Sequence, residues 1–99
     1  MDEPLLTVIA EFWARPASEE ALRALLMGLV APSRKEPGCV QYDLHVDNKE
    51  AGHFLFYENW RSQAALDEHV ATPHFKDFQA RAASLVREPP RAVFASRIG

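Results

Sequence analysis

The 99-residue chain has little of three things: cysteine, long apolar runs and basic clusters. The single Cys39 excludes an internal disulfide and is typical of a reducing compartment such as the cytoplasm. No apolar run approaches the roughly 20 residues that cross a bilayer, so we expect no membrane partner. A net charge of −3, with no basic stretch longer than Arg34-Lys35, argues against nucleic acid.

Motifs that hold common cofactors are also missing. The chain has neither a G-x-G-x-x-G stretch nor a Walker-type loop, which argues against a nucleotide or a flavin. It has no G-x-S-x-G nucleophile motif. Its four histidines show no H-x-x-x-H or H-x-H spacing, and one cysteine does not make a ligand set. We therefore expect no cofactor and no metal site.

The apolar pattern predicts four strands and two helices in a single domain over residues 5–98. Alternating or β-branched apolar residues indicate strands at 5–14, 40–46, 53–60 and 91–98. One helix begins after Ser18, a good N-cap, and ends near Pro32. The other begins after Ser62, restarts at Thr72-Pro73 and continues to Pro89-Pro90. The order strand, helix, strand, strand, helix, strand indicates an α+β, ferredoxin-like fold with an antiparallel sheet.

The first and third strands are apolar on both faces, which predicts a homodimer. Val8 and Phe12 point to one side of the first strand while Ile9 points to the other, and Tyr57 lies opposite the neighbouring aromatic residues of the third. An antiparallel sheet with one face in water should alternate apolar and polar residues. Two helices cover one face, so a second subunit is the expected cover of the other.

Glu58 is an acid inside an aromatic strand. It alternates onto the same face as Phe54, Phe56 and Trp60. A carboxylate is costly to bury among apolar groups without a partner or a chemical task. Glu58 is therefore either a general base with a raised pKa or a structural carboxylate that accepts hydrogen bonds. Trp60 is either the wall of a ligand cavity or a core anchor.

His69 lies on the rim of the apolar face of the second helix. A neutral imidazole there could accept a proton from a phenol near pH 7. The alternative is a histidine that interacts with the free carbonyls at the helix C-terminus. His74 falls in the first turn of the restarted helix and is more typical of a surface or hinge position.

Three motifs in this region resemble the antibiotic biosynthesis monooxygenase family. The family pattern has an aromatic strand that ends in E-x-W, a helix with A-L-x-x-H, and then T-P-H-F. The corresponding segments here are Glu58-Asn59-Trp60, Ala65-Leu66-Asp67-Glu68-His69 and Thr72-Pro73-His74-Phe75. The resemblance implies a dimeric α+β barrel with a pocket in each subunit.

The resemblance also implies an activity and a set of site residues. Better-studied branches oxygenate quinols or other electron-rich phenols with O₂ and use no flavin, metal or haem. The partners would then be a small aromatic, quinol-like substrate and O₂. The residues that the resemblance nominates are Glu58, Trp60, His69, Tyr42 and Phe75. We interpret His69 as the base, Trp60 and Phe56 as pocket walls, and Glu58 as the partner that orients the base.

Two other functions are compatible with the same residues. One is a non-enzymatic protein that holds a small apolar molecule, and the other is an isomerase of a small signalling metabolite, as in related branches of the family. A binding protein and an enzyme need the same cavity. Turnover of a substrate separates them.

Overall fold

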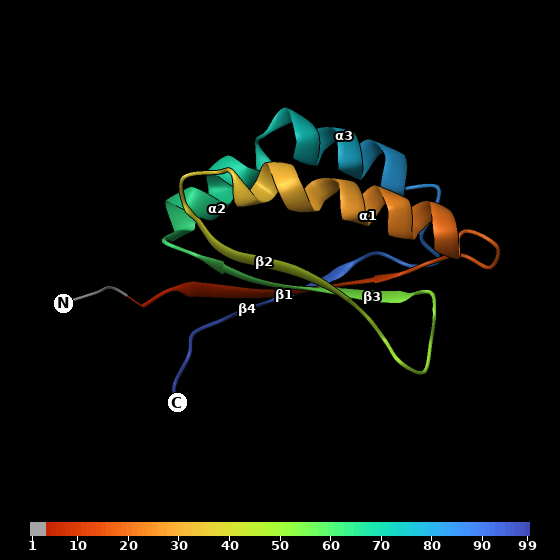
Figure 1. Cartoon of the computed structure of the whole chain (residues 1–99), viewed down its shortest axis with the longest axis horizontal. Coiled ribbons are helices and arrows are strands. Elements are labelled where there is room, and N and C mark those ends of the chain that lie inside the picture. The colour runs from red at the N-terminus through yellow and green to blue at the C-terminus, as the bar shows by residue number, and fades with distance from the viewer. Residues whose placement is uncertain (1–3) are drawn as a thin grey trace.

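The computed structural model describes residues 4–99 as a four-stranded antiparallel sheet with three helices on one face (Figure 1). The strand order is β2-β3-β1-β4, which confirms the predicted ferredoxin-like α+β fold. In chain order the elements are β1 (Leu6–Trp13), α1 (Glu19–Arg34), β2 (Cys39–Val46), β3 (His53–Trp60), α2 (Gln63–Val70), α3 (Pro73–Ala82) and β4 (Arg91–Ala95). No helix in residues 4–99 is long and apolar enough to span a membrane.

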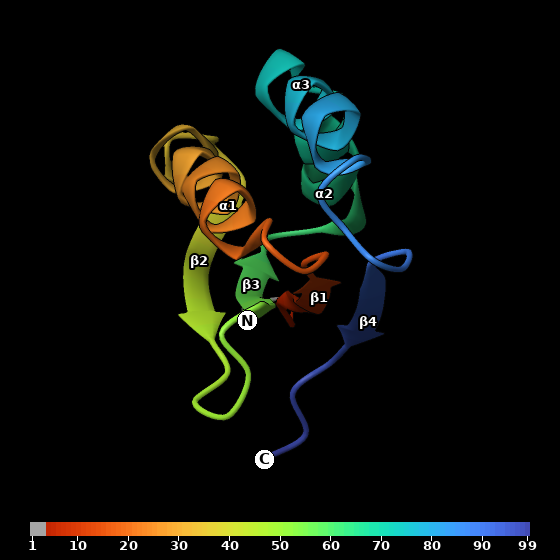
Figure 2. The ribbon, with the colours of Figure 1, turned by 90° about the vertical axis from the view of Figure 1, so that its right-hand side faces the viewer.

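The predicted second helix is two helices, α2 and α3, because each begins with its own cap. The Ser62 hydroxyl accepts a hydrogen bond from the Ala65 amide, and the Thr72 hydroxyl accepts one from the Phe75 amide. Pro73 takes the first position of α3, where a missing N–H costs nothing. In Figure 2, α1 lies above the β2 side of the sheet and the α2–α3 pair above the β4 side.

The predicted end of the second helix is wrong. α3 ends at Ala82, whereas the apolar stripe suggested that it continued to Pro89-Pro90. The Leu85 carbonyl instead accepts a hydrogen bond from the Arg15 amide, and Val86 pairs with Ala14 just beyond β1. These long-range backbone hydrogen bonds replace the hydrogen bonds of a helix. The helix therefore ends earlier than the pattern of apolar side chains indicates.

The core lies between the helices and the sheet and is mainly aromatic where it meets β3. Tyr42, Phe54, Phe56 and Trp60 are each no more than 1 % exposed. Strict alternation along β2 would place Val40 on the buried face with Tyr42, but the Val40 side chain is 45 % exposed. The pairing register shifts between Cys39 and Gln41, so Val40 is an extra residue in a bulge and leaves the alternation of β2.

The sheet face opposite the helices is uncovered in the described chain (Figures 1 and 2). Ile9 lies directly between Tyr57 and Val93 in the strand register, and these three side chains share that face. Tyr57 is 40 % exposed and Val93 is 44 % exposed. The apolar strip that the sequence predicted is therefore present, and it crosses β3, β1 and β4.

Candidate active site

A cavity of about 550 Å³ lies between the sheet and the α2–α3 pair. Its walls are mostly apolar, with Val8 and Phe12 from β1 on one side and Leu66 and Phe78 from the helices on the other. The edge strand β4 contributes Phe94, which is 61 % exposed. The size and the apolar lining are those of a small-molecule site.

Five of the six residues that the sequence nominated line this cavity. They are Tyr42, Phe56, Glu58, His69 and Phe75. The register of the sheet brings Tyr42 and Glu58 together, because they are direct partners across β2 and β3 and point to the same face.

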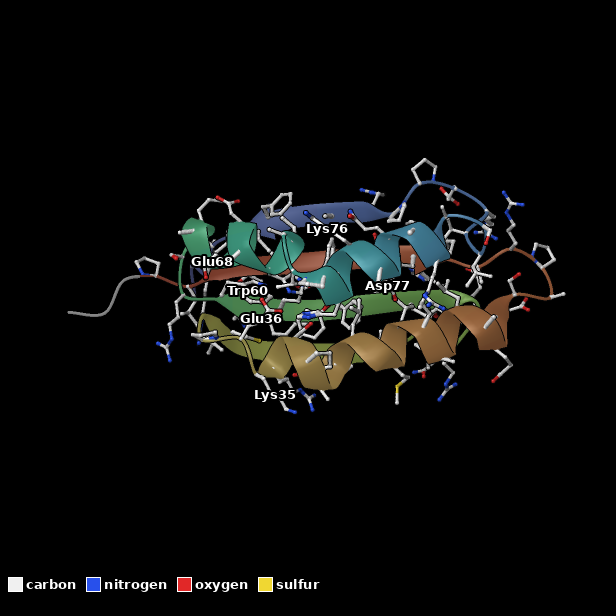
Figure 3. All side chains as sticks on the ribbon, turned by 90° about the horizontal axis from the view of Figure 1, so that it is seen from above. Lys35, Glu36, Trp60, Glu68, Lys76 and Asp77 are labelled. Carbon is white, nitrogen blue, oxygen red and sulfur yellow. The ribbon has the colours of Figure 1, made fainter. Side chains whose placement is uncertain are left out.

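Trp60 does not line the cavity, which corrects its predicted role as a pocket wall. Its side chain is fully buried beneath the helices, and Figure 3 shows it between α1 and α2. The indole Nε1–H donates a hydrogen bond to the Glu58 carboxylate over 2.8 Å. The Trp60 ring also packs against His69 with ring centroids 4.5 Å apart. Trp60 therefore acts from the core, where it fixes the positions of two cavity residues.

Glu58 is the buried acid of the cavity, with 5 % of its surface exposed. Burial raises the pKa of its carboxyl to about 7, and the hydrogen bond from Trp60 opposes this rise. The negative charge of Glu36 raises the pKa further. A carboxyl group with this pKa exchanges a proton readily near neutral pH, as a general acid or base must.

His69 is the buried base of the cavity, and its partner is Glu36. The ring Nδ1 lies 2.7 Å from Glu36 Oε2, and the side chain is 2 % exposed. A carboxylate only accepts hydrogen bonds, so Nδ1 carries the proton and Nε2 keeps its lone pair. Burial lowers the pKa of His69 below its usual range, and the hydrogen bond from His69 to Glu36 opposes this. The imidazole is therefore neutral at pH 7.

The sequence predicted that Glu58 orients His69, but the carboxylate that bonds His69 is that of Glu36. Glu58 bonds Trp60, and Glu36, from the turn between α1 and β2, bonds His69. The same Glu36 oxygen lies 2.9 Å from His74 Nε2. Sequence reasoning missed this cluster because Glu36 is 33 residues from His69 and reads as an ordinary turn residue before Pro37-Gly38.

An aromatic shell surrounds the His69 ring. The ring centroids of Tyr42 and Phe75 lie 5.4 and 4.8 Å from it. Burial raises the pKa of Tyr42 far above its usual range, so its hydroxyl keeps its proton at neutral pH and can donate a hydrogen bond. The shell leaves two buried groups of the cavity that can exchange a proton: His69, as a neutral base with a lowered pKa, and Glu58, as an acid with a pKa of about 7.

Two groups of side chains within residues 4–99 have the geometry to accept a cation, although histidine spacing predicted no metal site. They are Glu36, His69 and His74, and Asp47, Glu50 and His53, each with ligand atoms within 4.8 Å of one another. In the first group the distances of 2.7 and 2.9 Å are those of N–H···O hydrogen bonds. In the second, His53 bonds Asp47 and Glu11 in the same way.

The arrangement can take a proton from a bound phenol and return one later. His69 lines the cavity and keeps Nε2 as its acceptor nitrogen because Nδ1 bonds Glu36, and Glu58, in the same lining, is an acid with a pKa of about 7. Two groups whose surroundings shift their pKa values in different directions are the usual signature of paired acid and base roles.

Comparison with known proteins gives consistent matches along the chain. The sequence model of a family described as "Antibiotic biosynthesis monooxygenase" matches residues 5–81. The chain is 40% identical over 84 residues to "Putative monooxygenase Rv0793" of Mycobacterium tuberculosis, covering 85% of this chain and 82% of that one. It is 33% identical to "Probable quinol monooxygenase YgiN" of Escherichia coli, covering 75% and 81% of the two chains. The crystal structure of PA3566 from Pseudomonas aeruginosa superposes with a TM-score of 0.95 at 39% identity, covering 100% of this chain and 99% of that one.

Proposed function

The chain belongs to the antibiotic biosynthesis monooxygenase family, and we propose that it oxidises a quinol or another electron-rich phenol with O₂ in the cavity beside His69. The observation that carries the proposal is the apolar cavity in which a neutral histidine and a carboxyl group with a pKa of about 7 are the buried titratable pair. The similarity to a probable quinol monooxygenase supports the substrate class.

The proposed reaction needs no external reductant, because the quinol supplies all the electrons. Loss of a phenolic proton gives an electron-rich anion that transfers electrons to O₂ and forms a carbon–oxygen bond at the ring. The resulting hydroperoxide loses water as its O–O bond breaks, and the ring carbon becomes a carbonyl. One quinol and one O₂ thus give one hydroxylated quinone and one water. No organic cofactor enters this scheme.

The site residues are assigned by where their polar atoms lie. His69 accepts the phenolic proton at Nε2, because Nδ1 is held by Glu36, and it returns this proton to the peroxide anion, which gives the hydroperoxide. Glu58 in its protonated form gives a proton to the departing hydroxide and then regains one from the ring carbon. Tyr42, Phe56 and Phe75 are the aromatic walls that hold the ring.

We also propose that two copies of the chain pair through the uncovered sheet face. The strip of Ile9, Tyr57 and Val93 is apolar and partly exposed, and covering it would remove that surface from water. Sedimentation equilibrium should give twice the protomer mass of 11.2 kDa. Tyr57→Glu, which places a charge in the strip, should shift the mass toward the protomer. A single protomer mass in the parent at every concentration contradicts the dimer.

The test of the activity is an aerobic panel of quinols with oxygen uptake as the readout. The parent should exceed the uncatalysed rate on at least one quinol. His69→Ala should lower kcat by about 10²–10⁴-fold, which is the usual contribution of a general base. Glu68→Gln is the matched control, because Glu68 is an exposed acid beside His69 in sequence and should leave kcat unchanged.

Labelled oxygen separates the proposed reaction from its rivals. With ¹⁸O₂, one labelled atom should enter the organic product and the other should enter water. A quinone without label, formed together with hydrogen peroxide, would make the protein an oxidase instead. Saturable binding of a quinol with no turnover would favour the non-enzymatic binding protein, and a rearranged product formed without oxygen uptake would favour an isomerase.

A further inference from the structure

The cluster of Glu36, His69 and His74 is a connected hydrogen-bonded group that leads from the cavity wall toward the surface. The side chains are 2 % exposed in His69, 12 % in Glu36 and 28 % in His74. One oxygen, Glu36 Oε2, joins the two rings, at 2.7 Å from His69 Nδ1 and 2.9 Å from His74 Nε2. The cavity includes His69 but neither of the other two in its lining.

Contacts in the α2–α3 joint and in the turn before β2 hold this cluster in place. Thr72 donates a hydrogen bond from its hydroxyl to the His69 carbonyl over 2.7 Å and caps α3 with the same oxygen. This joint holds His69 and His74 close together although they lie on different helices. Glu36 belongs to a turn in which its carbonyl accepts a hydrogen bond from the Cys39 amide. Gly38 in that turn touches Ala65 of α2, so closely that a side chain would not fit.

We propose that Glu36 is a positioning residue that keeps His69 in the tautomer with its Nε2 lone pair toward the cavity, and that His74 competes for the same carboxylate oxygen. Because Glu36 accepts from both rings, its oxygen is shared between them. A carboxylate bonded to Nδ1 stabilises the imidazolium that forms when Nε2 accepts a proton. When His74 donates to the same Glu36 oxygen, the carboxylate stabilises the His69 imidazolium less. Burial lowers the basicity of His69, and two residues that do not line the cavity adjust it further.

The groups that face His69 explain the expected directions. Glu36 favours the protonated ring through its hydrogen bond and its charge, and His74 disfavours it. Tyr42 faces the ring as a neutral phenol, and Glu58 lines the same cavity and is hydrogen-bonded to Trp60, which packs against the His69 ring. Removing Glu36 and removing His74 should therefore move the pKa of His69 in opposite directions. A purely structural role would not produce opposite signs.

The experiment is an NMR titration of the histidine ring nitrogens in the full-length protein, which requires no substrate. In the parent at neutral pH, the His69 proton should be on Nδ1. Glu36→Gln should lower the pKa of His69, and His74→Ala should raise it. Glu68→Gln is the control, because it removes one negative charge from α2 without touching the cluster, and it should leave the pKa of His69 nearly unchanged. Dispersed amide spectra establish that each variant is folded.

Three results would overturn the proposal. They are a His69 proton on Nε2 in the parent, shifts of the same sign in the two variants, and no shift in either. A titration with Zn²⁺ gives a further test: one equivalent bound by the parent and lost in both Glu36→Gln and His74→Ala would make the cluster a cation site instead.

The catalytic part of this inference rests on the proposed function and has its own readout. With a quinol that the parent oxidises, Glu36→Gln should lower kcat by about 10²-fold through loss of orientation, with KM nearly unchanged. Glu36→Asp, which keeps the charge, should recover part of the loss. If the parent oxidises no quinol, the proposed function fails, and the NMR titration still decides whether Glu36 and His74 control His69.

Discussion

Glu58→Gln should make the protein more stable above neutral pH. In the folded protein burial raises the pKa of Glu58 to about 7, whereas an unfolded chain would show the ordinary value of about 4.5. Between these values the folded state holds a proton that the unfolded state has lost, so the stability of the parent falls as pH rises through this window. At about 1.36 kcal/mol for each of roughly 2.5 pH units, ionised Glu58 costs the folded state ~3 kcal/mol at pH 8.

Glutamine removes this cost because it keeps the shape and carries no charge. Its amide oxygen can still accept the hydrogen bond from Trp60 Nε1, which spans 2.8 Å in the parent. Urea unfolding of both proteins at one concentration should show no difference near pH 4.5 and a rising advantage for the variant up to pH 8. With a slope of about 2 kcal/mol per molar urea, the midpoint should rise by roughly 1.5 M.

The difference between the two proteins isolates Glu58, because His69 contributes with the opposite sign and is present in both. The pKa of His69 is lowered by burial, so its contribution to stability is lost as pH falls. Glu68→Gln, at an exposed acid, should not give the rising advantage. Parallel stability profiles for the parent and Glu58→Gln would refute the argument that burial in this wall raises the pKa of Glu58.

Two further predictions concern the turn before β2 and the hairpin between β2 and β3. Gly38→Ala should destabilise the protein by about 1–3 kcal/mol in thermal unfolding, because the new methyl group would collide with Ala65. Gly28→Ala, at an open position inside α1, should instead stabilise it by about 0.5–1 kcal/mol. Equal effects of the two substitutions would contradict the close approach of the Gly38 turn to α2. Asp47→Asn should lower the pKa of His53 in an NMR titration, because the hydrogen bond with Asp47 is the largest cause of its raised pKa. The stability that this hydrogen bond contributes is present below pH 6.5 and is lost as pH rises through the folded pKa of His53. Asp47→Asn should therefore lose stability at acidic pH only. A loss of equal size at every pH would refute this account.

Local patterns predicted the elements well where local physics decides them. The alternation of β3 and the caps at Ser62 and Thr72 gave the strand and the helix starts, because side-chain direction and capping depend on near neighbours. The end of α3 could not be predicted in this way. Its apolar stripe continues past Ala82, but the residues beyond it form backbone hydrogen bonds with Trp13 and Arg15, which are distant in sequence, and so leave the helix.

In the candidate site too, the residues with a local sequence signal could be predicted and those without one could not. Residues on the helix-facing side of β3 were identifiable, because alternation places Phe56 and Glu58 on one face and the cavity lies on that face. Trp60 continues the alternation but lies beyond the cavity wall, and alternation says nothing about where a cavity ends. Glu36 had no local signal, since a carboxylate before Pro37-Gly38 is typical of any turn.

The two carboxylates of the site therefore differ in a way that follows from their partners. Glu58 is bonded by an indole, a neutral donor, and its burial favours the protonated form. Glu36 is contacted by two imidazole rings through one oxygen and lies closer to the surface. The negative charge of Glu36 in turn raises the pKa of Glu58. Glu36 is thus suited to stabilise a positive charge on His69, and Glu58 is suited to release and regain a proton. Acid–base chemistry on a phenol requires both roles.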